Sequence, residues 1–204
     1  IKAIEISLKF GIHGLPLMGG GDWNDGMNKI GEEGKGESVF VAWFLIETLL
    51  NFSPICKELG DDEKAASFLE TAEKIKVSAN ENAWDGEWFR RAYYDNGTPV
   101  GSADEECCKI DSVSQSWAVI SGGTDSKRAK KAFESAFKIL ASDSLGIIKL
   151  LTPPFTGEGK NPGYIASYPE GIRENGGQYT HAAVWLAIAA AILGEDDAAW
   201  TLCE

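Results

Sequence analysis

Two long glycine-rich segments interrupt an otherwise helical sequence and limit what this chain can fold into. Residues 11–36 contain nine glycines, and a second such segment covers residues 157–177. Loops longer than about 15 residues are uncommon in compact domains, where they are usually functional or disordered. Together these two hold Trp, Tyr, Asp, Asn and His, which is not a disordered composition. We therefore expect functional loops on a helical scaffold.

Helical periodicity accounts for most of the remaining sequence. A clean apolar stripe runs from Ala129 to Leu140, whereas Asn96-Gly97 favours a tight turn and predicts a hairpin within residues 84–101. Pro153-Pro154 forbids helix at the end of an extended segment, 145–154. Helices are expected over residues 1–10, 37–59, 111–119 and 178–193, and further helices are expected to start at Asp61 or Asp62, at Asp125 and at Glu195. The helix that starts at Asp61 or Asp62 carries on one face Ala65, Phe68, Leu69, Ala72 and Ile75. Residues 1–204 should thus form a single all-α domain with a small β-hairpin insertion.

Charge and composition exclude several classes of function. The net charge of −12 argues against a nucleic-acid partner, because phosphates need a basic face. No run of 18 apolar residues predicts a membrane span, and Glu47 interrupts the apolar stretch 39–50. The four cysteines lack metal-ligand spacing, so we expect no metal site and reduced thiols in a cytoplasmic protein. The chain opens within a helical pattern and without Met, as a piece of a longer protein would.

The first loop carries a compact polar and aromatic group. Asp22, Trp23, Asn24 and Asp25 lie between glycines, which allow the backbone to approach a ligand closely. A Trp face suits the C–H side of a sugar, Asp and Asn bind hydroxyls, and one Asp can act as proton donor. From composition alone, a simple turn with Asp caps is an equal alternative. The alternating oxygen ligands of a calcium loop are missing.

The second loop and the helix after it hold the other candidates: Tyr168, Arg173, Glu174, Gln178 and His181. A His and an Arg near a helix N-terminus make an anion site, because free backbone N–H groups add to their charge. The alternative is an ordinary helix start with His181 hydrogen-bonded in the core.

Other polar and aromatic residues have plainer interpretations. Asp111 is expected as an N-cap. Arg90-Arg91 could reach an anion but is expected as an exposed pair, while Trp43 and Trp185 lie in apolar helices and are expected in the core. The sequence contains no phosphate-binding Gly-x-x-x-x-Gly-Lys motif and no nucleophile elbow.

Four segments carry a resemblance to a known family. They are Gly14-Leu-Pro-Leu-Met-Gly-Gly-Gly-Asp-Trp-Asn-Asp-Gly-Met-Asn28, Trp88-Phe-Arg-Arg-Ala-Tyr-Tyr94, Gln115-Ser-Trp-Ala-Val-Ile-Ser121 and Tyr168-Pro-Glu-Gly-Ile-Arg-Glu-Asn-Gly-Gly-Gln-Tyr-Thr-His181. In this order they resemble the catalytic region of glycoside hydrolase family 94. That family holds cellobiose and chitobiose phosphorylases, 1,2-β-oligoglucan phosphorylases and part of the cyclic β-1,2-glucan synthases. The β-1,2-glucan branch is most similar.

The resemblance implies an (α/α)6 barrel, of which this chain would be a C-terminal-half fragment. It also implies inverting phosphorolysis of β-glucosides to α-glucose 1-phosphate, with an oligosaccharide and inorganic phosphate as substrates and no cofactor. Asp25 matches the general acid, Trp23 the donor-sugar subsite and His181 a phosphate ligand. Tyr168 and Arg173 fall on the acceptor side, with Asp22, Asn24, Glu174 and Gln178 as further expected substrate contacts.

Alternatives stay open at this point. An inverting hydrolase needs a second carboxylate about 6.5–9.5 Å from the acid, for which Asp22, Glu174 and Asp111 are candidates. A non-catalytic region of a glucan synthase, a membrane-anchored parent and a homodimeric parent enzyme are also compatible with the sequence. Because about half of the barrel is missing, we expect little or no activity from the fragment alone.

Overall fold

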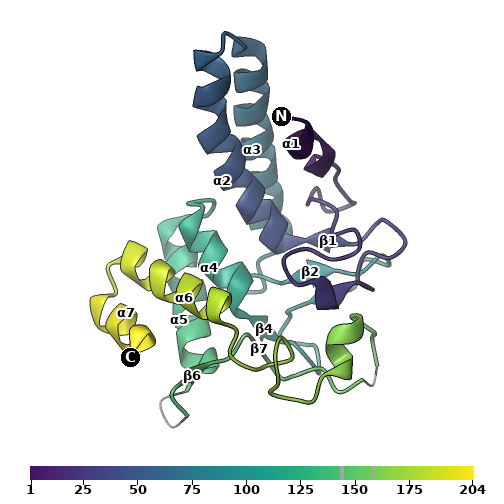
Figure 1. The fold of residues 1–204 in the computed structure, drawn as a ribbon, viewed down its shortest axis with the longest axis vertical. Coiled ribbons are helices and arrows are strands. Elements are labelled where there is room, and N and C mark those ends of the chain that lie inside the picture. Colours follow the sequence, from purple (N-terminus) through teal and green to yellow (C-terminus); the bar gives the residue numbers. More distant parts are fainter. Residues whose placement is uncertain (143–144, 158) are drawn as a thin grey trace.

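Helices dominate the structure, a computed structural model that describes residues 1–142, 145–157 and 159–204 (Figure 1). The α-helices are α1 (Lys2–Ser7), α2 (Val39–Glu58), α3 (Asp62–Asn82), α4 (Ser112–Ile120), α5 (Ser126–Leu140), α6 (Thr180–Leu193) and α7 (Asp196–Cys203). Two 3-10 turns, η1 (Asp25–Met27) and η2 (Tyr164–Ser167), lie inside the two long loops. The helical scaffold with long loops is confirmed, although residue 158 of the second loop lies outside the described residues.

Helices α2 and α3 form a long antiparallel hairpin that projects from the rest of the molecule (Figure 1). Ser38 Oγ accepts a hydrogen bond from the Val41 N–H at the start of α2, and the Asp61 side chain caps α3 in the same way, as expected. Trp43 of α2 is fully buried, as expected, and its ring packs edge to face on Phe89. Leu69 is 41% exposed, so its assignment to the buried face of α3 is wrong.

By length and hydropathy alone, α2 could cross a membrane, which the sequence analysis did not expect. Half of its apolar window is buried inside the protein, where the helix packs on α3 and α4. A core helix of a globular domain gives the same signal.

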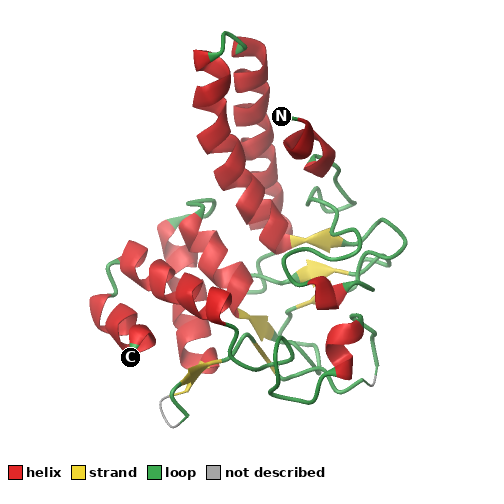
Figure 2. Ribbon diagram, in the orientation of Figure 1, coloured by secondary structure: helices red, strands yellow, loops and turns green. Residues whose placement is uncertain are grey.

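Helices α4 to α7 form a second helical group beside the hairpin (Figure 2). The stripe on α5 is confirmed, because Ala129, Phe133 and Leu140 are buried against α6. Gly194 ends α6 with a φ of 73°, a left-handed value that suits glycine, and α7 follows directly.

Short strands connect these helices to the loops. In the three-stranded antiparallel sheet, β1 (Glu37–Ser38) pairs with β2 (Ala92–Tyr93), which pairs with β3 (Pro99–Val100). The predicted hairpin is confirmed as β2 and β3, and the added strand β1 brings the end of the first loop beside it. Two further antiparallel pairs join β4 (Ile110–Asp111) to β7 (Leu151–Thr152) and β5 (Ala141–Ser142) to β6 (Ile147–Ile148).

Candidate carbohydrate-binding site

Asp25 lies at the first position of η1, with its side chain exposed to solvent. Asn24 precedes it and is 2% exposed; its Oδ1 accepts a hydrogen bond from the Gly26 N–H at 3.2 Å. The Asn24 side chain therefore fixes the turn that presents Asp25, and its burial argues against a direct sugar contact.

The second loop packs directly on this turn. The Lys29 N–H donates to the Pro162 carbonyl at 3.1 Å, and the Tyr164 N–H donates to Asn28 Oδ1 at 3.1 Å. Glycine is required at this contact, because a β-carbon on Gly163 would lie 2.3 Å from Asn28 Oδ1. The two loops are thus locked together although more than a hundred residues separate them in sequence.

This contact brings Tyr164 to Asp25. The Tyr164 hydroxyl lies close enough to the Asp25 carboxylate to interact with it, and this interaction, with a smaller effect of burial, raises the pKa of Tyr164 to about 12. Tyr164 is 42% exposed, so the pair faces solvent. The sequence held no signal for this pairing, because Tyr164 and Asp25 lie more than a hundred positions apart.

Tyr168, Arg173 and Glu174 form the next part of the site. The Tyr164 and Tyr168 rings meet edge to face at 6.1 Å, and the Arg173 guanidinium lies 4.9 Å from the centre of the Tyr168 ring. Arg173 Nε is 3.2 Å from Glu174 Oε2. Arg173 is exposed, so a cation and an aromatic face are available to a ligand near Asp25.

Trp23 sits in an aromatic group at the start of α6. Its ring centre is 5.2 Å from Tyr179, 6.3 Å from His181 and 5.3 Å from Trp185. The exposed His181 ring stacks on Trp185 at 5.7 Å. Trp185 is only partly buried, so it lines this group as well as touching the core. No described side chain caps α6, and its first turn holds no acidic residue, so its positive end is open to an anion.

Asp22 is placed differently from its neighbours. Its side chain is 0% exposed, and both its oxygens accept hydrogen bonds from the Arg91 guanidinium at 2.7 Å. Ser38 Oγ donates to Oδ2 at 2.6 Å and the Asn24 N–H to Oδ1 at 3.0 Å. These bonds hold the pKa of Asp22 below its ordinary value despite the opposing effect of burial. Asp22 therefore anchors the loop and is closed to a sugar.

The expectation of an exposed Arg90-Arg91 pair is wrong. Arg91 is fully buried, and Arg90 is partly buried in an ion pair with Asp85. The sequence could not reveal this, because the partner of Arg91 lies 69 residues away.

Asp111 is the N-cap of α4, as expected, and its Oδ1 accepts from the Val113 N–H at 2.8 Å. Its Oδ2 is 3.4 Å from Arg91 Nε, on the side of the guanidinium away from Asp22. Burial raises the pKa of Asp111 to about 6, although Arg91 opposes this effect.

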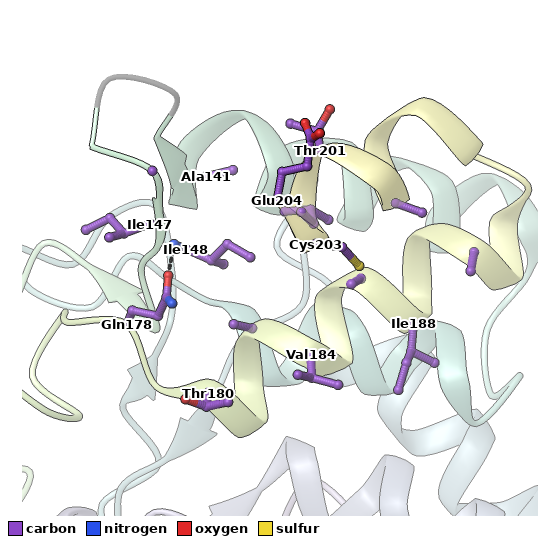
Figure 3. A pocket seen from close by; sticks show the side chains of 16 residues that line it. Ala141, Ile147, Ile148, Gln178, Thr180, Val184, Ile188, Thr201, Cys203 and Glu204 are labelled. Carbon is purple, nitrogen blue, oxygen red and sulfur yellow. Dashed lines mark hydrogen bonds between the residues drawn. The ribbon is translucent and has the colours of Figure 1, made fainter.

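Gln178 points away from this group. Its Oε1 accepts a hydrogen bond from the Ile148 N–H at 2.7 Å, and it borders a cavity of about 820 Å³ between β6, α6 and α7 (Figure 3). Val184 and Ile188 make this cavity largely apolar, and Asp25, Trp23 and His181 do not line it. The cavity is therefore separate from the site. Among the described residues, no group of three or more His, Cys, Asp or Glu side chains could hold a metal ion.

The domain is rich in helices, and its two interlocked loops and the start of α6 carry an exposed carboxyl, aromatic side chains and the positive end of a helix dipole. These are features of a carbohydrate-active catalytic domain. The chain belongs to the glycosyl hydrolase 94 superfamily, whose catalytic-domain model matches residues 1–204. This confirms the family resemblance of the four sequence segments.

Curated relatives agree with this assignment. The chain is 43% identical over 200 residues to the cyclic beta-(1,2)-glucan synthase NdvB of Rhizobium meliloti (strain 1021), covering 98% of this chain and 7% of that protein. It is 37% identical to two proteins of Paenibacillus borealis, each covering 93% of this chain. They are a 3-O-beta-D-glucopyranosyl-beta-D-glucuronide phosphorylase, of which it covers 24%, and a solabiose phosphorylase, of which it covers 25%. The chain thus spans a quarter or less of these relatives.

Proposed function

We propose that the protein containing this chain is a glycoside phosphorylase that cleaves β-glucosides with inversion, and that Asp25 is its general acid. The observation that carries this proposal is the exposed Asp25 carboxyl, two residues from Trp23, on a turn against which the second loop with Tyr164 packs. The phosphorylases among the relatives support the reaction type.

In this reaction Asp25 gives its proton to the glycosidic oxygen while a phosphate oxygen attacks the anomeric carbon from the opposite face. The bond from the anomeric carbon to the leaving oxygen breaks, and its electron pair stays on that oxygen with the new proton. The products are α-glucose 1-phosphate and a saccharide shortened by one unit. One essential protein carboxyl is enough, because phosphate replaces the activated water of an inverting hydrolase.

His181 and the open start of α6 are the proposed phosphate contacts. The anion would meet the positive end of the helix dipole and an exposed imidazole at the same place. Trp23 is proposed to bind the donor sugar, and Tyr168 and Arg173 to lie on the acceptor side. An oligosaccharide of β-1,2-linked glucose is the proposed substrate, supported by the similarity to a cyclic β-1,2-glucan synthase.

The direct test is phosphate dependence in the full-length protein. Incubation with β-1,2-glucooligosaccharides should release α-glucose 1-phosphate only when inorganic phosphate is present, and NMR identifies the anomer. Glucose release without phosphate would instead indicate a hydrolase. In that case Glu174 is the remaining candidate base, because its side chain is 9% exposed beside Arg173, whereas the side chains of Asp22 and Asp111 are 0% and 1% exposed. Glu174→Gln would then abolish cleavage.

A further inference from the structure

Arg91, the buried arginine directly before strand β2, has no part in the reaction as described. Its contacts connect it to the segment that carries Asp25. We propose that Arg91 is a positioning residue, which holds the segment from Asp22 to Asp25 in the orientation needed for proton transfer. This inference rests on the proposed function, because it gives Arg91 a role in the same step.

Arg91 is fixed at its backbone before its side chain makes any contact. Its N–H donates to the Val100 carbonyl at 2.7 Å, and its carbonyl accepts from the Val39 N–H at 3.2 Å. Gly101 lets the chain pass closely, because a β-carbon there would lie 2.5 Å from Arg91 N. The guanidinium therefore projects from a framework formed by β3 and the first residue of α2.

The Arg91 side chain then holds the first loop in place through hydrogen bonds. Two parallel hydrogen bonds of 2.7 Å join the guanidinium to the Asp22 carboxylate, and such a fork fixes both distance and angle. Asp22 in turn accepts from the Asn24 N–H, and Asn24 caps the turn that begins at Asp25. Arg91 is thus joined to Asp22 and Asp22 to Asn24 by hydrogen bonds, and the peptide bond after Asn24 leads to the acid.

Burial makes this link costly to break. The Arg91 and Asp22 side chains are both 0% exposed, so neither can exchange its partner for water. Asp111 Oδ2 lies 3.4 Å from Nε of the same guanidinium, so a second buried carboxylate faces it. A buried, doubly paired arginine of this kind gives the loop one position, which general acid catalysis requires.

Arg91→Lys in the full-length protein tests this role. Lysine keeps the positive charge between the two carboxylates, but a single ammonium cannot form the parallel pair of bonds. Arg90→Lys is the matched control, since Arg90 is the adjacent residue and pairs with Asp85, outside the loop. Phosphorolysis is measured with a β-1,2-glucooligosaccharide and with dinitrophenyl β-glucoside, whose leaving group departs without a proton.

For Arg91→Lys we expect kcat on the oligosaccharide to fall on the order of 10- to 100-fold with KM within about twofold, and a much smaller loss on the aryl glucoside. The ratio of the two rates does not depend on how much of the protein is folded. Asp22→Asn, which removes the charge at the other end of the pair, should shift this ratio in the same direction. Arg90→Lys should leave it unchanged.

An equal loss on both substrates, or the same ratio in Arg91→Lys and Arg90→Lys, would overturn the positioning role. Wild-type turnover in the same assay separates the two proposals. Absence of phosphate-dependent cleavage by the wild type would refute the proposed function itself. Normal wild-type turnover, with the same ratio of oligosaccharide to aryl-glucoside rates in Arg91→Lys, would refute only the role of Arg91.

Discussion

Asp111 carries the surplus negative charge of the buried group that it forms with Asp22 and Arg91. Asp22 takes both terminal nitrogens of the guanidinium, whereas Asp111 reaches only Nε, at 3.4 Å. Burial therefore outweighs attraction for Asp111, and its pKa rises to about 6. A carboxyl with a raised pKa stabilises the fold when protonated, and this stabilisation is lost as the pH rises through about 6.

Asp111→Asn should therefore stabilise the protein at neutral pH. Asparagine can still cap α4 but carries no charge, so we expect a gain of about 1–3 kcal/mol at pH 7.5 that shrinks between about pH 6 and 4. Chemical denaturation at several pH values measures it. Asp125→Asn, at the exposed N-cap of α5, is the control and should give little change. A gain that is independent of pH would contradict the assignment of the surplus charge to Asp111.

Tyr164→Phe tests the hydroxyl that reaches the acid. We expect this hydroxyl to donate to the carboxylate that forms as Asp25 gives up its proton. A hydrogen bond to a charged group contributes about 1.5–3 kcal/mol, so kcat for phosphorolysis should fall roughly 10- to 100-fold. Because Tyr164 is 42% exposed, the melting temperature should hardly change. Tyr94→Phe, in the hairpin region, is the matched control and should keep the wild-type kcat. Equal kcat values in both variants would mean that the Tyr164 hydroxyl does not assist Asp25.

At the scale of elements, the contact between η1 and η2 decides whether the site exists. Gly163 has a φ of 125°, and a β-carbon there would meet Asn28 Oδ1 at 2.3 Å and the Gly26 carbonyl at 2.5 Å. Gly171 also has a positive φ, 79°, but a β-carbon there would meet nothing within 4 Å. Comparing substitutions at the two positions therefore distinguishes the cost of backbone strain from the cost of steric overlap.

Gly163→Ala should destabilise the protein by about 2–4 kcal/mol, because strain and overlap add. Gly171→Ala should cost only about 1–2 kcal/mol, since only the backbone term applies. Denaturant unfolding compares them, and phosphorolysis should be lost in the first variant alone. Similar values for both variants would mean that the loops are not held together at Gly163.

The elements that local chemistry determines could be predicted from the sequence. The Asp61 and Asp125 caps, the stripe on α5 and the Asn96-Gly97 turn each depend on residues a few positions apart. Strand β1 could not be predicted, because its two residues pair with β2 across more than fifty positions. The prediction that Leu69 is buried was wrong for a different reason, because helical periodicity does not say how wide the buried face of α3 is.

At the scale of the whole molecule, the candidate site joins the first loop, the second loop and the start of α6, which meet at the Lys29–Pro162 and Asn28–Tyr164 contacts and at the Trp23 and Trp185 rings. The composition of the loops and the family resemblance predict Asp25, Trp23 and His181 as site residues. The contacts of Arg91 and Tyr164 could not be predicted, because their partners Asp22 and Asp25 are remote in sequence. Residues that do chemistry stand out by type, whereas residues that hold them in place become visible only in three dimensions.

The central claim is that Asp25 supplies the proton in a phosphate-dependent cleavage. The most direct measurement is kcat for phosphorolysis of a β-1,2-glucooligosaccharide by the full-length protein and its Asp25→Asn variant, with Asp104→Asn as an exposed control. We predict a fall on the order of 10²–10⁴-fold for Asp25→Asn, an unchanged melting temperature and wild-type turnover in the control. Turnover by Asp25→Asn within twofold of the wild type would contradict the account.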